Sequence, residues 1–278
     1  MSGRTALVTG ASNGSLGEAT ARLLRLEGFR VLTTTRSAVT AVETHALDLA
    51  SAASVQGFAS WLEGATDRLD LLVNNAGIHL DLRSTWKSPQ LLDGHEVHWR
   101  TNYLGTAHLT RLLLPLLTTT AREHGEARVV NVVSKLHSRG SNEALFAGVT
   151  PYDSWAAYGT SKLALVHDTT ELERRYGDLG VHAYSLHPGS VHTRIADRGL
   201  ETAPVLARAR KLLAAVERRA LLTPEQGART TVFCATSPDA VPGGYHRDCR
   251  AVDPSPEARD ADVAGRLWAR TEEWVGGC

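Results

Sequence analysis

The sequence predicts an α/β fold in a single domain, with a doubly wound parallel sheet covered by helices on both faces. Two observations predict it. Apolar, β-favouring runs recur along the 278 residues, and helix-like amphipathic stretches separate them. The strand runs are continuously apolar rather than alternating, which is typical of parallel strands buried on both faces. The connections between such strands are right-handed crossovers, so helices are expected on each side.

The expected elements follow in a regular order. Strands are predicted at TALVTG near residue 5, RVLTTT near 30, a short one before ALDLA, LDLLVNNAG near 70, RVVNVVS near 128, VHAYSLHPG near 181 and GGYHRDC. After the first strand, SLGEATARLLRLEG places its apolar residues near one helix face, and Gly28 can end that helix. The polar stretch 138–154 is the nearest thing to a break, and we expect it to line the substrate pocket.

A second expected pocket wall lies near the C-terminal third. The helical pattern of Gly199–Ala220 interrupts the strand rhythm, and we predict a helical substrate lid at about 194–222, with an ordinary surface helix as the alternative. Residues 1–278 are otherwise expected to form one dinucleotide-binding and catalytic domain, because no linker or internal repeat divides them.

The bulk composition limits the partners. Thirty basic and thirty acidic residues give a formal net charge of zero, which argues against a nucleic acid or an anionic membrane as the partner. The longest apolar run, Leu109–Leu117, contains Arg111 and Pro115, so no membrane anchor is expected. A small-molecule substrate is therefore the expected partner, and the helices around residues 102 and 158 are long enough to pair in a homodimer.

Cysteine usage and the N-terminus point to the compartment. Cys234, Cys249 and Cys278 are too few and too irregularly spaced for a disulfide framework or a zinc site. Only Met1–Arg4 precede the first predicted strand, which leaves no room for a signal peptide. We expect a cytoplasmic protein.

The stretch TGASNGSLG follows the first strand and predicts a phosphate-binding turn. Glycines let backbone amides approach a pyrophosphate, and the following helix N-terminus adds partial positive charge. A ligand of a doubly wound sheet lies beyond the carboxyl ends of its strands, where this turn falls. The residues expected to contact the dinucleotide here are Gly10, Ser12, Asn13, Gly14, Ser15, Leu16 and Gly17.

The end of the second strand favours NADP(H) over NAD(H). A site for the unphosphorylated ribose usually has a carboxylate about 20 residues after the glycines, and this chain has Thr35 and Arg36 there. A guanidinium can hold a 2′-phosphate in a bidentate fork, although a lone arginine is also commonly just a solvated charge.

Two further strand ends are expected to contact the cofactor. The turn ALDLA contributes Asp48 and Leu49, with a helix cap as the alternative role for Asp48. In LVNNAG, Asn75 offers an amide, while Ala76 and Gly77 are small enough for a flat ring to lie close to the backbone.

The motif YGTSK carries the strongest chemical signal. Tyr158 and Lys162 are four residues apart, so on a helix their side chains share a face. A cation beside a phenol stabilises the phenolate, and we expect it to lower the tyrosine pKa by about 1 to 3 units. Ser134, at a strand end, would hydrogen-bond the same carbonyl oxygen, and Asn102 could hold a water beside Lys162.

The motif HPG ends the next strand. Pro188 and Gly189 could form a turn against the nicotinamide face, with Val191 and Thr193 as partners for its carboxamide; a plain strand-end turn is the alternative. The twelve histidines show no metal-binding spacing, so we expect no metal site, and they are more simply solvated or packed. His137 is the exception, a candidate for the pocket mouth.

These motifs together resemble a known family. The order TGxxx…G, NNAG, Asn102, Ser134, YxxxK and PG resembles the short-chain dehydrogenase/reductases over almost the whole chain. Within that family, VVSKLH, YSLHPGSVHTRI and the tail DPSPEARDADVAGRLWARTEEWVG look like the retinol-dehydrogenase-like and WW-domain-oxidoreductase-like branch. The resemblance implies a Rossmann fold with a seven-stranded parallel sheet, nicotinamide-dependent redox chemistry, a catalytic tetrad of Asn102, Ser134, Tyr158 and Lys162, and Arg36 at the NADP-selecting position.

One departure from the family pattern lies in the glycine loop. The pattern T-G-x-x-x-G-x-G has one intervening residue before its last glycine, whereas Ser15 and Leu16 both precede Gly17 here. Either Ser15 is a bulge that leaves Gly17 at the helix start, or the loop opens wider and the Ser15 hydroxyl itself contacts phosphate. Both alternatives keep an anion site.

The sequence therefore predicts an NADP(H)-dependent oxidoreductase that interconverts a ketone or aldehyde and an alcohol, on a small lipophilic or secondary-metabolite substrate. Two alternatives stay open. One is a biosynthetic enzyme that catalyses dehydration, cyclisation or alkene reduction on the same fold. The other is a redox sensor that binds dinucleotide without turnover.

Overall fold

The computed structural model describes residues 3–36, 43–191 and 221–276. Its centre is an eight-stranded sheet in the order β10-β9-β8-β7-β4-β1-β2-β3. Seven strands of this sheet are parallel to one another, as predicted. They are β1 (Thr5–Val8), β2 (Arg30–Thr35), β3 (Thr44–Ala46), β4 (Leu71–Asn74), β7 (Ala127–Val132), β8 (Val181–His187) and β9 (Tyr245–Arg247).

Two short β-elements were not predicted. Strand β10 (Arg250–Val252) turns back antiparallel to β9 and adds an eighth strand at the edge. A separate hairpin joins β5 (Leu91–Leu92) to β6 (His95–Glu96) through Asp93 and Gly94, which both have positive φ. An Asp-Gly pair with positive φ at both residues is typical of a type I′ hairpin turn, so this dipeptide is a local hairpin signal that does not depend on long apolar runs.

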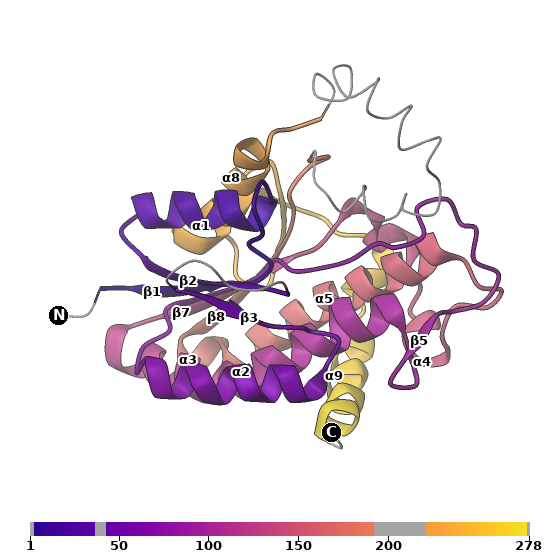
Figure 1. Cartoon of the computed structure of the whole chain (residues 1–278), viewed down its shortest axis with the longest axis horizontal. Coiled ribbons are helices and arrows are strands. Elements are labelled where there is room, and N and C mark those ends of the chain that lie inside the picture. Colours follow the sequence, from indigo (N-terminus) through magenta and orange to yellow (C-terminus); the bar gives the residue numbers. More distant parts are fainter. Residues whose placement is uncertain (1–2, 37–42, 192–220, 277–278) are drawn as a thin grey trace.

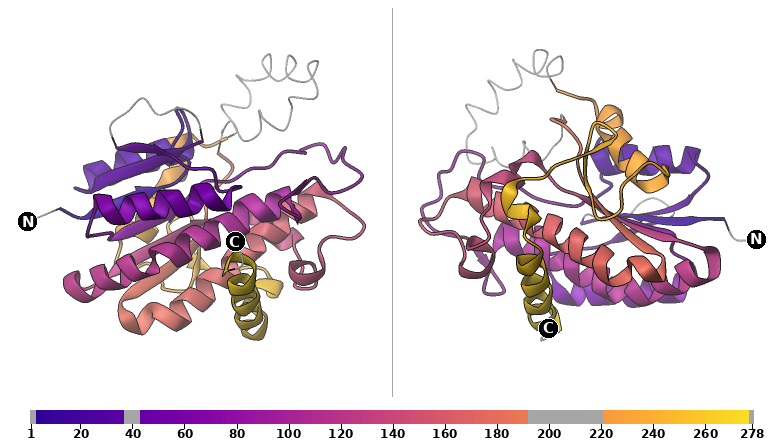
Figure 2. Two further views of the ribbon diagram at one scale, coloured as in Figure 1. Left: turned by 60° about the horizontal axis from the view of Figure 1, so that its bottom comes forward. Right: turned by 180° about the vertical axis from the view of Figure 1, so that it is seen from behind.

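Helices cover both faces of the sheet (Figure 1). On one face α1 (Leu16–Leu26) packs against α8 (Pro224–Thr236). On the other lie α2 (Ala52–Ala65), α3 (Gly105–His124) and α5 (Ser154–Tyr176), with α9 (Ala261–Gly276) packed outside α5 (Figure 2). The remaining described helical segments are η1 (Trp99–Leu104), η2 (Lys135–Arg139), α4 (Ala144–Ala147), η3 (Gly177–Leu179) and η4 (Pro256–Arg259).

Alternate residues of one strand face opposite layers. In β1, Leu7 packs into the core beneath α2 and α3, whereas Ala6 and Val8 pack into the core beneath α1 and α8. All three side chains are fully buried. Two apolar layers on one sheet explain why the strand sequences are continuously apolar.

Local caps position the helices that matter for the site. Asp153 begins α5 by accepting hydrogen bonds from the Trp155 and Ala156 amides, and Thr223 with Gln226 forms a capping box at the start of α8. Gly28, with φ of +83°, follows the end of α1, as predicted.

The winding of the sheet reverses between β1 and β4, which are neighbours although β2 and β3 separate them in sequence. In a doubly wound sheet this switch point, at the carboxyl ends of the strands, is where a ligand binds. Within the described ranges, no helix is long and apolar enough to cross a membrane. Thr193 and nearly all of the expected lid at 194–222 lie outside the described residues.

Candidate active site

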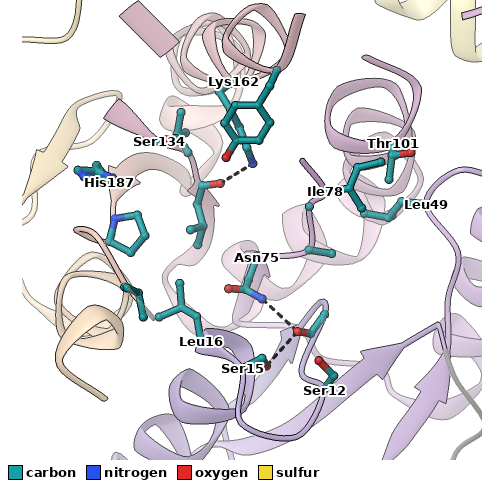
Figure 3. A pocket seen from close by; sticks show the side chains of 18 of the residues that line it. Ser12, Ser15, Leu16, Leu49, Asn75, Ile78, Thr101, Ser134, Lys162 and His187 are labelled. Atoms are coloured by element: carbon teal, nitrogen blue, oxygen red, sulfur yellow. Dashed lines mark hydrogen bonds between the residues drawn. The ribbon is translucent and has the colours of Figure 1, made fainter. Parts of the chain in front are cut away.

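A cleft opens at the switch point (Figure 3). Its volume is about 360 Å³, within the range of about 300–1,000 Å³ that is usual for small-molecule sites. Fifteen of the residues that we predicted to be functional line it. They are Gly10, Ser12, Ser15, Leu16, Arg36, Leu49, Asn75, Ala76, Gly77, Ser134, Tyr158, Lys162, Pro188, Gly189 and Val191.

The floor of the cleft is built from backbone, and two glycines make this possible. Gly10 has φ of +72°, and a Cβ there would lie 2.8 Å from Ala76 Cα. A Cβ on Gly17 would lie 2.5 Å from Asn75 Nδ2 and 2.7 Å from Gly10 O. Larger residues at either position would push the β1 and β4 ends apart, so the close approach requires glycine.

Hydrogen bonds tie these two strand ends together. The Asn75 side-chain amide donates to Thr9 O at 2.7 Å and to Gly10 O at 3.3 Å. In return, Thr9 Oγ1 accepts from the Asn75 and Ala76 backbone amides, each at 3.0 Å. The NNAG motif therefore acts here as a clamp on the glycine loop, which leaves the small Ala76 facing the cleft.

Ser15 resolves the question of the extra loop residue. It is the N-cap of α1: its hydroxyl accepts from the Glu18 amide at 3.1 Å and donates to Gly10 O at 3.3 Å. Gly17 lies at the start of the helix, in the first turn. This geometry is that of the bulge, in which Ser15 starts the helix and the helix N-terminus keeps its direction toward the cleft.

The outer part of the loop lies away from the cleft. Asn13 and Gly14 are exposed and do not line it. The Gly14 amide donates to the Glu18 carboxylate at 2.6 Å. Asn13, Gly14 and Gly17 thus shape the loop, whereas Ser12, Ser15 and Leu16 face the cleft.

The end of the second strand brings one predicted residue to the cleft. Arg36 follows β2, is exposed and lines the cleft. Asp48 does not line it. Its carboxylate accepts from the Ala50 amide at 3.0 Å in the turn before α2. The N-cap of α2 is Ser51, so the alternative role of a helix cap is wrong for Asp48. Its neighbour Leu49 is buried and lines the cleft.

Tyr158 and Lys162 lie in the cleft on one face of α5, as the spacing predicts. Both are nearly fully buried, at 8% and 4% exposure. Lys162 Nζ donates to the Val132 carbonyl oxygen at 3.1 Å and lies 5.9 Å from the centre of the Tyr158 ring. Ser134, which follows β7, lies close enough to the Tyr158 hydroxyl to lower its pKa as a hydrogen-bond partner.

The ionisation of this pair differs from the expectation. Burial raises the pKa of Tyr158 to about 12, and the hydrogen bond from Ser134 offsets only part of that rise. Burial also lowers the pKa of Lys162 to about 8. The predicted lowering of the Tyr158 pKa is therefore wrong for the protein on its own, because burial of the phenol raises the pKa more than the hydrogen bond with Ser134 lowers it.

Asn102 is brought to the site by an unusual helix. The segment η1 is π-helical, and the Gly105 amide donates to Arg100 O. The Asn102 side chain accepts from the Ile78 amide at 2.8 Å and donates to Ile78 O at 3.0 Å. It does not line the cleft. A Cβ on Gly77 would nevertheless lie 3.4 Å from Asn102 Oδ1 and 3.3 Å from Lys162 Nζ, so the two side chains converge beside Gly77.

Several cleft residues were not predicted. Ile78, Thr101 and Leu136 line it, and so do Lys135 and His187. Burial and the nearby Lys135 lower the pKa of His187 to about 4. No local sequence signal distinguishes these residues, although each lies within a few positions of a predicted strand end or of Asn102.

Two other expectations for the pocket walls were wrong. No residue of 138–154 lines the cleft. His137 does not lie at the mouth either: it is 4% exposed, hydrogen-bonds Ser134 O at 2.8 Å and accepts from the Ser255 amide at 3.0 Å. That histidine ties η2 to the chain before η4, which is a structural role.

A glycine-lined cleft at the switch point of a doubly wound sheet, with a tyrosine, a lysine and a serine gathered in it, defines the class of protein: an oxidoreductase that uses a nicotinamide dinucleotide. Residues 4–203 match the sequence model of the family described as short chain dehydrogenase. The chain belongs to this family.

Individual relatives identify the branch of the family. The chain is 37% identical over 306 residues to retinol dehydrogenase 14 of Mus musculus, covering 99% of this chain and 87% of that protein. It is 37% identical over 287 residues to polyprenol dehydrogenase of Mus musculus, covering 96% and 82%. The predicted retinol-dehydrogenase-like branch is thus confirmed. A crystal structure of an uncharacterised protein from Mycobacterium paratuberculosis superposes with a TM-score of 0.72 at 32% identity, covering 98% and 93% of the two chains.

Proposed function

We propose that the protein is an NADP(H)-dependent oxidoreductase that interconverts a ketone or aldehyde and an alcohol. The observation that carries this proposal is the contact of Tyr158 with Ser134 inside the cleft, with Lys162 on the same helix face. These groups lie within reach of the dinucleotide cradle made by the β1 and β4 ends. They are the proton-transfer groups that reduction of a carbonyl requires.

The cleft residues fit a dinucleotide. Its floor is backbone that a Cβ at Gly10 or Gly17 would fill, and the N-terminus of α1 supplies partial positive charge for a pyrophosphate. Arg36 lies exposed at the edge, where a 2′-phosphate would add charge. We propose that Pro188, Gly189 and Val191 contact the nicotinamide end, and that Thr193 does so from outside the described residues.

Each chain residue has a proposed role in reduction. The bound cofactor supplies the hydride to the carbonyl carbon. Ser134 and Tyr158 hydrogen-bond the carbonyl oxygen, and Tyr158 transfers its phenolic proton to that oxygen as the C=O double bond becomes single. A pKa of about 12 keeps the phenol protonated at neutral pH, which suits proton donation. Lys162, whose pKa is about 8, can return a proton to the phenolate.

The cleft walls support a lipophilic substrate. Leu49, Ile78, Val132, Val133 and Leu136 line it with apolar side chains. Two relatives are named as dehydrogenases of retinol and polyprenol, and we propose a carbonyl or alcohol of similarly apolar character, with a secondary metabolite within that range.

Consumption of NADPH and NADH with a panel of ketones and aldehydes tests the proposal, with Tyr158→Phe as the comparison. We expect turnover by the wild type, preference for NADPH, and a loss of kcat of at least about 100-fold in the variant. Equal rates in the two proteins would remove the mechanism.

The assembly and location are also proposals. A homodimer is compatible with the chain, but we propose that it does not form through the outer face of α5, because α9 packs there and buries Trp268. Light scattering measures the mass of the assembly. A dimer interface that hydrogen exchange maps to the outer face of α5 would contradict this proposal.

We further propose a cytoplasmic location, which cell fractionation tests. We also propose a substrate lid at 194–222, which protection from proteolysis by substrate tests.

A further inference from the structure

A buried histidine lies flat on the proposed proton donor. The His79 and Tyr158 rings are parallel within 9°, and their centres are 4.4 Å apart. His79 is 3% exposed and does not line the cleft. It therefore contacts the tyrosine from behind the reacting surface, and nothing in the NNAG, YxxxK or PG motifs indicates this contact.

His79 is itself held on two further sides. The Trp155 ring meets it edge-on at 4.7 Å and 83°, and the His98 ring at 5.5 Å and 79°. His98 is fixed in turn: Nε2 accepts from the Leu80 amide at 3.1 Å. Nδ1 consequently carries the proton and donates to the Glu96 carboxylate at 2.7 Å. The stacked His79 and Tyr158 rings are thus one end of a cluster of ring contacts that also contains Trp155 and His98.

His79 is an uncharged ring that covers one face of Tyr158. Its Nε2 is buried and has no hydrogen-bond partner within the residues the structure covers. Burial and the neighbouring His98 lower the pKa of His79 to about 4. The imidazole is therefore neutral at neutral pH, and it contributes a flat apolar surface rather than a charge or a proton to Tyr158.

The geometry makes that surface consequential. Among the described residues, Ser134 is the side chain whose hydrogen bonding lowers the pKa of the Tyr158 hydroxyl. A displacement of the ring along its normal, toward His79, would move the hydroxyl out of line with Ser134. A parallel ring in van der Waals contact blocks displacement toward that side.

We propose that His79 is a positioning residue, which holds the Tyr158 ring so that its hydroxyl stays directed at Ser134 and the reacting oxygen. This inference rests on the proposed function. The proposed role depends on the flat shape of His79 and not on its ionisation. We therefore expect a planar apolar ring to substitute for His79, and a branched aliphatic side chain of similar size not to do so.

The test compares His79→Phe with His79→Leu, both of which fill the site with apolar atoms. We expect His79→Phe to keep kcat within about threefold of the wild type and His79→Leu to lose at least about tenfold, as expected for misplacement of a reacting group. The KM for NADPH should stay within about twofold in both, because His79 does not touch the cofactor cleft. His45→Ala, which removes another histidine that packs against an aromatic ring, Trp61, controls for a general loss of packing.

Equal kcat values in the two variants would overturn the proposal, whether both match the wild type or both fall together. Thermal melting of each variant shows that folded protein is compared. Failure of the proposed function would give a different result: the wild type itself would show no turnover, or the Tyr158→Phe variant would have the same rate as the wild type.

Discussion

The Lys162 ammonium lies 3.1 Å from the Val132 carbonyl oxygen, and no ion pair to Lys162 occurs within the described ranges. Its pKa is lowered from 10.5 to about 8 because it is buried. Keeping the charged form in the folded state therefore costs about 3 kcal/mol below pH 8.

Replacing this lysine should separate stability from activity. We expect Lys162→Met to melt at or above the wild-type temperature at pH 7 while kcat falls by about 100-fold or more. Between pH 8 and 10.5 the unfolded chain holds the proton that the folded protein has released, so wild-type stability should rise with pH, and this rise should be absent in the variant. Lys87→Met, at an exposed position, is the control. A variant that melts well below the wild type would contradict this view of Lys162.

Arg36 is expected to select the phosphorylated coenzyme. A charge-assisted hydrogen bond contributes about 1.5–3 kcal/mol, so Arg36→Leu should raise the NADPH dissociation constant by about 10- to 100-fold and leave that of NADH within about threefold. Fluorescence titration measures both. Arg229→Ala, an exposed arginine of α8, should change neither. The same loss for both coenzymes would show that Arg36 does not contact a 2′-phosphate.

Ser15 is expected to contribute to the helix and not to cofactor recognition. Ser15→Ala removes the N-cap of α1 and should lower the free energy of unfolding by about 1 kcal/mol. The NADPH dissociation constant should change by less than about threefold. Ser51→Ala removes the equivalent cap of α2, away from the cleft, and should give a similar loss of stability. A large loss of NADPH affinity in Ser15→Ala alone would identify the hydroxyl as a phosphate contact.

Acid should destabilise the protein through its buried histidines. Burial lowers the pKa of His167 to about 4; Nε2 hydrogen-bonds Asn142 Oδ1 at 2.9 Å, and Nδ1 is buried without a partner in the described part of the chain. Between pH 6.5 and 4 the unfolded chain binds a proton that the folded protein does not, so stability falls as the pH falls. We expect His167→Gln to reduce that fall by up to about 3 kcal/mol in urea titrations, and the exposed His124→Gln to leave it unchanged. Identical pH curves for His167→Gln and the wild type would be inconsistent with this.

The sheet was predictable because parallel strands buried on both faces must be continuously apolar, and the central strands β1, β4 and β7 are buried along their whole length. Strands β3 and β9 are short and partly exposed, and their place followed from the alternation of strands and helices. The same logic brings Gly10, Asn75, Ser134 and Pro188 together, since the carboxyl ends of parallel strands meet at one edge. Strand β10 and the β5–β6 hairpin were not found, because each is two or three residues long and carries no apolar period.

The environment of each site residue was less predictable than its position. The spacing of Tyr158 and Lys162 identifies neighbours but not burial, and burial determines the direction of both pKa shifts. The faces of Ile78, Thr101 and Leu136 depend on the π-helix η1 and on η2, which no sequence period indicates. The stack of His79 on Tyr158 likewise depends on tertiary packing.

The central claim, that hydride is added to a carbonyl carbon while Tyr158 protonates its oxygen, is tested most directly by the fate of a label. NADPH carrying deuterium at C4 of the dihydronicotinamide, with turnover of an accepted ketone, should yield an alcohol with deuterium on the carbon that bore the oxygen, and Tyr158→Phe should form almost none of it. Deuterium on a neighbouring carbon, as in alkene reduction, or a product without deuterium, would contradict the account.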